Sequence, residues 1–296
     1  MAAPRCVRPG VTHMITRRCA GRAFRLRPSG ATNEILQYCY ALAAHKTGVD
    51  IHAIVVMSNH HHALVTDREG RLPDFLRELH RLTAKAMNAS QGQWENLWAA
   101  EAPHELEVGD SEDLLRRIAY MAANPVEAGL VPTPEEWPGV LHLPSDDERG
   151  LRVQRPKAYF GPRSRSPREI ELRITPPPRI RDVAARVGAA VAEAVERARA
   201  AVAAKGWSFL GRAKVLSTSF VKRARSLERK RKIVPRVAAR SMFVRVRMLD
   251  AIREFRRAYH AALATWRAGE RSAEFPDGTW WMRVFHGANV VSAPSL

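Results

Sequence analysis

The sequence has few cysteines and no long apolar run, and each absence excludes a class of protein. Three cysteines occur among 296 residues (Cys6, Cys19 and Cys39), without a CxxC spacing. This argues against both a disulfide framework and a zinc–cysteine site. No stretch approaches the roughly 18 apolar residues that span a bilayer, and the N-terminus has no apolar signal segment. We therefore expect a cytoplasmic protein without a membrane partner.

Acidic residues are scarce in the second half of the chain. Residues 1–150 contain 16 basic and 19 acidic residues, whereas residues 151–296 contain 32 and 11, a net charge of +21. A bias toward arginine in the genome is the alternative explanation, but the first half is not basic. The second half is therefore predicted to bind a polyanion such as nucleic acid. The densest run is KRARSLERKRK, whose candidate phosphate contacts are Lys222, Arg223, Arg225, Arg229, Lys230, Arg231 and Lys232.

The first half alternates strand and helix patterns. Period-two and β-branched segments predict strands at Val11–Arg18, Val49–Met57, His60–Thr66 and Glu105–Val108. Helical periodicity predicts helices at Asn33–Lys46, Leu72–Ala89 and Asp110–Asn124, the last ended by Pro125. The order β-α-β-β-α-β predicts an α+β fold with a ferredoxin-like (RRM-like) antiparallel sheet.

Three regions are predicted along the chain: a domain over 1–145, a linker over 146–179 and a basic helical region over 180–296. Prolines and arginines crowd Arg152–Pro178, which is typical of a linker. Beyond it we expect helices up to Lys205, over Phe220–Lys232 and over Val237–Arg267. The aromatic segment Glu274–His286 is expected to pack back as a loop or strand.

The segment NHHHALV places three histidines at the start of a predicted strand. Alternate residues of a strand share a face, so His60 and His62 lie together and His61 points away. Two imidazoles at this spacing can bind one divalent metal ion. An H-x-H pattern alone is a weak signal, because it is frequent by chance.

The segment LLRRIAYMAAN carries a tyrosine on an unexpected face of a helix. At 100° per residue the apolar residues gather on one side, and Tyr120 falls nearly opposite them. Arg116 and Asn124 flank it, one turn away on either side. A tyrosine that packs against the sheet or a neighbouring chain is the alternative interpretation.

Taken together, MSNHHHALV and YMAANPVEAGLV resemble the two signature segments of single-tyrosine HUH transposases, in the REP-associated tyrosine transposase branch. The resemblance covers about Gly10–Val131. It implies a nuclease domain acting on single-stranded DNA, with His60 and His62 as metal ligands and Tyr120 as the nucleophile. Asn124 stands where the family has a third metal ligand or another polar residue of the site. His61 departs from the family, which has a hydrophobic residue there.

The resulting hypothesis is a transposase-type DNA endonuclease and strand transferase that forms a 5′-phosphotyrosine and uses Mg²⁺ or Mn²⁺. Arg116 is a candidate contact for the phosphate near Tyr120. The expected partner is single-stranded DNA with a hairpin or palindrome, a second copy of the chain is a further candidate, and the expected location is the nucleoid. The alternative is a catalytically silent protein that binds single-stranded DNA or RNA and keeps the fold.

Overall fold

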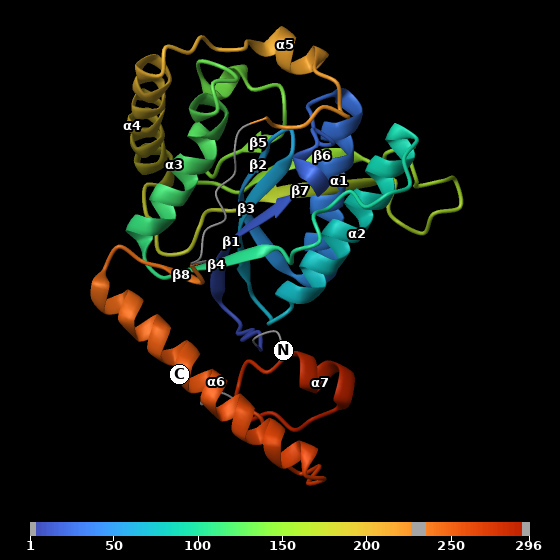
Figure 1. Ribbon diagram of the computed structural model, residues 1–296, viewed down its shortest axis with the longest axis vertical. Helices are drawn as coiled ribbons and strands as arrows, with labels where there is room; N and C mark the ends of the chain where they lie inside the picture. Colours follow the sequence, from blue (N-terminus) through green and yellow to red (C-terminus); the bar gives the residue numbers. More distant parts are fainter. Residues whose placement is uncertain (1–3, 226–234, 292–296) are drawn as a thin grey trace.

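The computed structural model describes residues 4–225 and 235–291, which form a mixed α+β fold (Figure 1). The strands are β1 (Val11–Arg18), β2 (Val49–Val56), β3 (His60–Asp67), β4 (His104–Val108), β5 (Leu141–His142), β6 (Arg149–Gln154), β7 (Glu169–Ile174) and β8 (Val237–Ala238). The α-helices are α1 (Gly30–Thr47), α2 (Leu72–Gln91), α3 (Ser111–Glu127), α4 (Val183–Ala204), α5 (Arg212–Ser217), α6 (Met242–Arg267) and α7 (Trp281–His286). Two short 3-10 turns lie at Ala20–Arg22 and Pro134–Glu136.

Six strands form one sheet in the order β5-β2-β3-β1-β4-β8. All neighbours run antiparallel except β4 and β8, which are parallel. The four longest of these strands follow one another in the chain as β-α-β-β-α-β, and β3 lies between β1 and β2. This is the ferredoxin-like arrangement, so the predicted fold class is confirmed.

Helices cover both faces of this sheet (Figure 1). α1 and α2 pack on one face, where Ala63 and Val65 of β3 join their apolar cluster. α3 packs on the opposite face, where Leu64 of the same strand joins a second cluster. The alternation of β3 side chains therefore decides which layer each residue of the triple histidine meets.

α3 begins at a local signal but continues past the residue that was predicted to end it. Asp110 caps α3, and its carboxylate accepts a 2.8 Å hydrogen bond from the backbone of Asp113. The prediction that α3 ends before Pro125 is wrong, because the helix continues to Glu127. A proline in a helix removes one donor but leaves its own carbonyl available, and Leu130 N donates to Pro125 O at 3.0 Å.

The stretch predicted to be a linker contains regular structure. β6 and β7 form a two-stranded antiparallel sheet. Val153, Phe160, Leu172 and Ile174 are buried in the apolar cluster of α1 and α2. The prediction of a linker over Arg152–Pro178 therefore missed a hairpin that packs on the core. The high proline and arginine content of this stretch obscured the short alternation of apolar and charged residues in β7. The apolar side chains of β7 face the core.

The second half is mainly helical. α4 and α6 occupy two of the predicted helical ranges, while α5 was not predicted. The helix expected over Phe220–Lys232 is absent from its described part, residues 220–225, and the remainder lies outside the described residues. The aromatic segment packs back on the N-terminal part of the chain, where Val7 N donates to Gly278 O at 2.9 Å, and it includes α7.

The structure also shows the state of the cysteines and the character of the longest helices. All three cysteines are unpaired. Among the helices in residues 4–225 and 235–291, none is both long enough and apolar enough to cross a membrane.

Candidate functional site

Two of the three adjacent histidines share one face of β3. His60 and His62 lie with Leu64 on the side of the sheet that α3 covers. Their ring centroids are 4.8 Å apart, and the ring planes meet at 82°. The strand therefore brings together the two imidazoles that alternation predicted as a pair.

A hydrogen bond at Nδ1 orients each of these imidazoles. Nδ1 of His60 donates to Oδ1 of Asn59 at 2.8 Å. Nδ1 of His62 lies 2.8 Å from the hydroxyl of Thr16, on the neighbouring strand β1. The Nε2 atom of His62 is buried and has no hydrogen-bond partner among the described residues. A buried polar atom without a partner is rare in proteins, and imidazole nitrogens are common metal ligands.

Burial keeps both imidazoles neutral at physiological pH. It lowers the pKa of His60 to about 4, and the positive charge of Arg18 adds to the shift. It also lowers the pKa of His62 well below its usual value, with His60 as the next cause. Metal binding requires the neutral imidazole, so the protonation state and the orphaned Nε2 atom both fit a metal ligand.

The histidine pair is not a complete set of metal ligands. Within residues 4–225 and 235–291, no group of three or more His, Cys, Asp or Glu side chains is arranged to hold a metal ion. A catalytic site keeps positions open for water and substrate, and amide or phosphate oxygens are suitable ligands for Mg²⁺ and Mn²⁺. The pair can thus supply two nitrogen ligands, and other groups would have to supply the remainder.

α3 presents Tyr120 beside the pair. The apolar side of α3, which includes Leu114, Ile118 and Met121, is buried, whereas Tyr120 keeps 40% of its surface exposed. The centroid of its ring lies 5.6 Å from that of His62. Because both residues belong to one chain, the helix brings the phenol to the histidine pair without a second copy.

A groove of about 450 Å³ runs between α3 and α4 next to Tyr120. Alanines from both helices line it, together with Arg116, Arg117 and Arg197. Arg116 lies 3.3 Å from the buried carboxylate of Asp113, and its side chain is mostly exposed. Arg116, the predicted phosphate contact, therefore lines the same groove as Tyr120, and its ion pair with Asp113 positions its guanidinium.

Asn124 is buried one turn beyond Tyr120, with 8% of its surface exposed. Among the described residues, no hydrogen bond joins its carboxamide to His60 or His62. Its assignment as a third metal ligand stays a prediction.

His61 points to the opposite layer, where its polar atoms have partners. Its Nδ1 lies 2.6 Å from the hydroxyl of Tyr40, and its Nε2 lies 3.2 Å from Nε2 of His80. The ring of Trp98 packs against it at 5.5 Å. Burial lowers the pKa of His61 well below its usual value, with the charge of His80 as the next cause. The residue that departs from the family pattern is therefore a neutral core residue with both ring nitrogens satisfied.

The described part of the basic run lies near the histidine strand. Lys222, Arg223 and Arg225 are exposed. The carbonyl of Lys222 accepts a 2.8 Å hydrogen bond from Phe24 N, in the loop that follows β1. The carbonyl of Arg22, in the same loop, accepts from the side chain of Asn59 at 3.4 Å. The segment that carries these three cations thus contacts the loop after β1, and the same loop contacts Asn59, which orients His60. Arg229, Lys230, Arg231 and Lys232 lie outside the described residues.

Two neighbours of the site could not be identified from the sequence. Thr16 pairs with His62 on one side and with His104 on the other. The imidazole Nε2 of His104 donates to the carbonyl of Pro235 at 2.7 Å. Thr16 lies in a predicted strand, and His104 directly precedes the predicted strand Glu105–Val108. Strand register was not predicted, and register brings Thr16 and His104 beside His62.

Comparisons with known proteins give matches only at the level of three-dimensional structure. No family model and no curated protein sequence matches the chain. One similar solved structure is that of a REP-associated tyrosine transposase bound to a REP hairpin. It is 20% identical with a TM-score of 0.40, over 47% of this chain and 81% of that chain. Another is a protein from Deinococcus radiodurans R1 assigned as a transposase. It is 18% identical with a TM-score of 0.29, over 40% of this chain and 93% of that chain. At these values the two likenesses establish neither the family nor the activity of the chain.

Proposed function

We propose that the protein is a nuclease and strand transferase of single-stranded DNA, with Tyr120 as the nucleophile beside a divalent metal bound by His60 and His62. The observation that carries the proposal is the position of the Tyr120 ring, 5.6 Å from the ring of His62, whose buried Nε2 has no hydrogen-bond partner among the described residues. The resemblance of MSNHHHALV and YMAANPVEAGLV to the signature segments of HUH transposases supports the same roles.

His60 and His62 would bind the metal through their Nε2 atoms, since their Nδ1 atoms are engaged. A bound Mg²⁺ or Mn²⁺ supplies polarisation of the phosphate oxygens and offsets negative charge in the transition state. Asn59 and Thr16 hold the two rings in position, which is the usual role of groups hydrogen-bonded to a metal ligand.

Tyr120 carries the covalent step. Its phenolic oxygen forms a bond to phosphorus, and the bond from phosphorus to the 3′ oxygen breaks. The phenol loses its proton to solvent, and the 3′ oxygen gains one, leaving a 5′-phosphotyrosine and a 3′-hydroxyl. The covalent intermediate keeps the energy of the phosphodiester, so a second 3′-hydroxyl can reverse the step and join new ends. Asn124 is proposed as a polar residue of this site.

The basic surroundings of Tyr120 suit a polyanionic strand. We propose that Arg116 contacts a phosphate in the groove between α3 and α4. Lys222, Arg223 and Arg225 would contact phosphates near the loop after β1, because arginine and lysine side chains supply most phosphate contacts. A hairpin-forming DNA strand is the proposed substrate.

A binding protein without cleavage activity is the second candidate. Within residues 4–225 and 235–291, no third His, Cys, Asp or Glu side chain joins the pair in an arrangement that could hold a metal, and this observation favours it. His61 gives it no support, because this side chain lies in the opposite layer with both nitrogens satisfied.

Incubation with a labelled single-stranded hairpin oligonucleotide and Mg²⁺ or Mn²⁺ separates the two candidates. We expect an adduct that resists SDS, that disappears with Tyr120→Phe or with a chelator, and that persists with Tyr259→Phe. Tyr259 is the control because it is a partly exposed tyrosine of α6 that has no role in the proposed site. An adduct that survives Tyr120→Phe would overturn the nucleophile assignment. Retained DNA binding without an adduct under either metal would favour the binding protein.

A further inference from the structure

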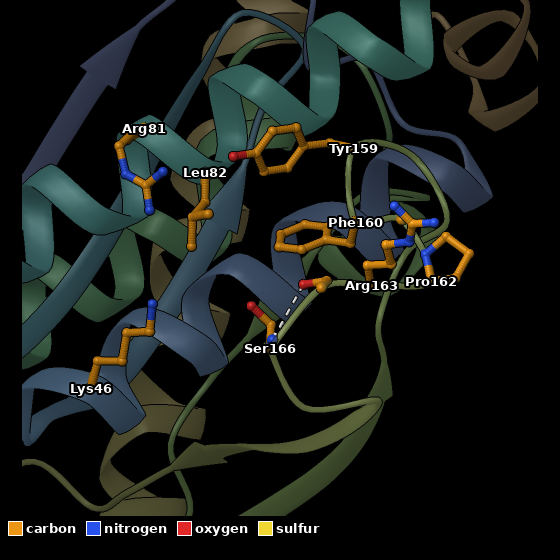
Figure 2. Close-up of a pocket in the computed structure, with 10 residues that line it drawn as sticks. Lys46, Arg81, Leu82, Tyr159, Phe160, Pro162, Arg163 and Ser166 are labelled. Atoms are coloured by element: carbon orange, nitrogen blue, oxygen red, sulfur yellow. Dashed lines mark hydrogen bonds between the residues drawn. The ribbon is translucent and has the colours of Figure 1, made fainter.

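A cavity of about 580 Å³ lies between α2, the end of α1 and the loop that joins β6 to β7 (Figure 2). Its lining includes Lys46, Arg81 and Leu82 from the helices and Tyr159, Phe160 and Arg163 from the loop. α1 and α2 cover the opposite face of the sheet from His60 and His62. The cavity is therefore separate from the site around Tyr120.

The loop over residues 155–168 has a fixed shape. The guanidinium of Arg155 donates to the carbonyls of Ser164 and Ser166, at 2.9 and 2.6 Å. The ring of Phe160 packs edge-on against Tyr38 at 5.1 Å. The hydroxyl of Tyr38 in turn donates to the carbonyl of Pro167 at 2.6 Å. The bonds of Arg155 tie the two ends of the loop together, and the contacts of Tyr38 attach the loop to α1, so the cavity is preformed.

Tyr159 holds an unfavourable backbone conformation while exposing its ring. Its φ is +68°, a value that a residue with a side chain rarely adopts. Its side chain is nevertheless 44% exposed, and the ammonium of Lys85 lies 5.4 Å from the ring centroid. Figure 2 shows the rings of Tyr159 and Phe160 directed from the loop toward Arg81 and Leu82. Residues held in strained backbone conformations cluster at active sites and ligand-binding sites.

The surroundings of the cavity carry an excess of positive charge. The loop contains five basic residues and no acidic one, as the sequence RPKAYFGPRSRSPR shows. Lys157, Arg163 and Arg165 are exposed, and none of them has an ion pair among the described residues. Lys46 and Arg81 share a single carboxylate, that of Glu78. An anionic ligand would therefore find several uncompensated cations here.

We propose that this cavity binds one nucleotide unit of a single-stranded nucleic acid, with a base on the Tyr159 ring and the adjoining phosphates on Arg163 and its basic neighbours. An aromatic ring beside a cationic groove is the recurring arrangement for unpaired strands, because every base has a face that can stack. Leu82 and Phe160 supply an apolar floor for the base. The choice of single-stranded DNA as the strand rests on the proposed function.

Photo-crosslinking and binding assays on the full chain test the proposal. An oligothymidylate carrying 5-iodouracil is expected to crosslink to the peptide that contains Tyr159. Fluorescence anisotropy is expected to show roughly tenfold weaker binding for Tyr159→Gly, because stacking of one base is lost, and near-normal binding for Tyr159→Phe. Arg163→Glu should also weaken binding. Arg152→Glu is the matched control and should leave binding unchanged. It makes the same change of charge at an exposed position of β6, outside the cavity.

The Tyr159→Gly variant separates a binding role from a structural one. Glycine accommodates a φ of +68° without strain, so its melting temperature should equal or exceed that of the wild type. A lower melting temperature together with normal binding would overturn the proposal, and so would crosslinks that avoid this peptide. The Tyr120 adduct is scored in parallel with the labelled hairpin oligonucleotide and Mg²⁺ or Mn²⁺. A Tyr159 crosslink without an adduct would contradict the proposed cleavage alone, and an adduct without the crosslink would contradict this inference alone.

Discussion

His61 departs from the HUH signature, but its side chain lies in a different layer from those of His60 and His62. It lies between the two proposed metal ligands in sequence, but strand alternation points it into the other layer. There it joins a buried row of polar groups from Tyr40 and His80. A buried imidazole costs free energy only when its nitrogens lack partners, and both of these nitrogens have one.

His61→Leu should therefore affect stability and spare the chemistry. The change leaves the Tyr40 hydroxyl and His80 Nε2 without a partner, and each loss costs about 1–3 kcal/mol of the free energy of unfolding. We expect urea unfolding to show a loss of about 3 kcal/mol, with adduct formation retained below the melting temperature. A folded His61→Leu protein that forms no adduct would contradict this separation of the two layers.

Thr16→Val should have the opposite effect. It removes the hydroxyl that orients His62 and preserves the size of the side chain. Loss of such a supporting hydrogen bond typically lowers metal affinity or activity by about 10–100-fold. We expect adduct formation to need a correspondingly higher metal concentration, while the unfolding midpoint in urea changes little. An unaltered metal dependence would show that Thr16 does not position His62.

The groove beside Tyr120 is a property of two helices together. α3 exposes Tyr120 on its polar side, and α4 packs on α3 through small residues, including Ala119 and Ala123 against Ala194 and Ala198. Small side chains allow the helices to approach closely and leave room at the edge where their surfaces diverge. α4 lies outside the range over which the sequence resembles HUH transposases, so this wall of the groove is a contribution of the basic second half.

Ala201→Trp tests whether the groove receives the substrate strand. Ala201 is exposed and lines the groove, so an indole should fill the space beside Tyr120 with little effect on folding. We expect adduct formation to slow by about tenfold, equivalent to about 1.4 kcal/mol of the activation free energy, with an unchanged melting temperature. Ala200→Trp is the matched control, since Ala200 is the exposed neighbour outside the groove. Equal rates for the two variants would exclude the groove from the path of the strand.

On the scale of the whole molecule, the predicted regions are joined by shared cores. The hairpin of β6 and β7 buries Leu172 and Phe160 in the cluster of α1 and α2. α4 buries Ala194, Val195 and Ala198 against α3. The division into a domain over 1–145, a linker over 146–179 and a basic region over 180–296 remains a prediction. The shared cores determine whether residues 1–145 can fold without the rest of the chain.

A fragment of residues 1–145 should fold poorly. It loses several fully buried apolar side chains of the hairpin, each of which contributes about 1.5–3 kcal/mol. A total on the order of 5 kcal/mol is comparable with the whole stability of a typical domain. We expect no cooperative thermal transition for the fragment by circular dichroism and a clear one for the full chain. A cooperative transition in the fragment would support the predicted domain boundary at residue 145.

Local periodicity was enough to predict the strand and helix order of the first half, the pairing of His60 with His62 and the outward position of Tyr120. Each of these depends on periodicity along a few consecutive residues, and a single chain segment dictates it. Proline and arginine content misled the prediction for Arg152–Pro178, because composition does not reveal that β7 finds an apolar partner in α1.

Which segments of the chain meet follows from its three-dimensional packing and could not be predicted from local patterns. The approach of Tyr120 to His62, the hydrogen bond from Thr16 and the satisfied nitrogens of His61 join residues from different elements. The cavity at Tyr159 likewise needs α1, α2 and a distant loop. Such contacts arise from strand register and helix packing, which depend on the sum of many weak interactions across the core. No local pattern of residues encodes that sum.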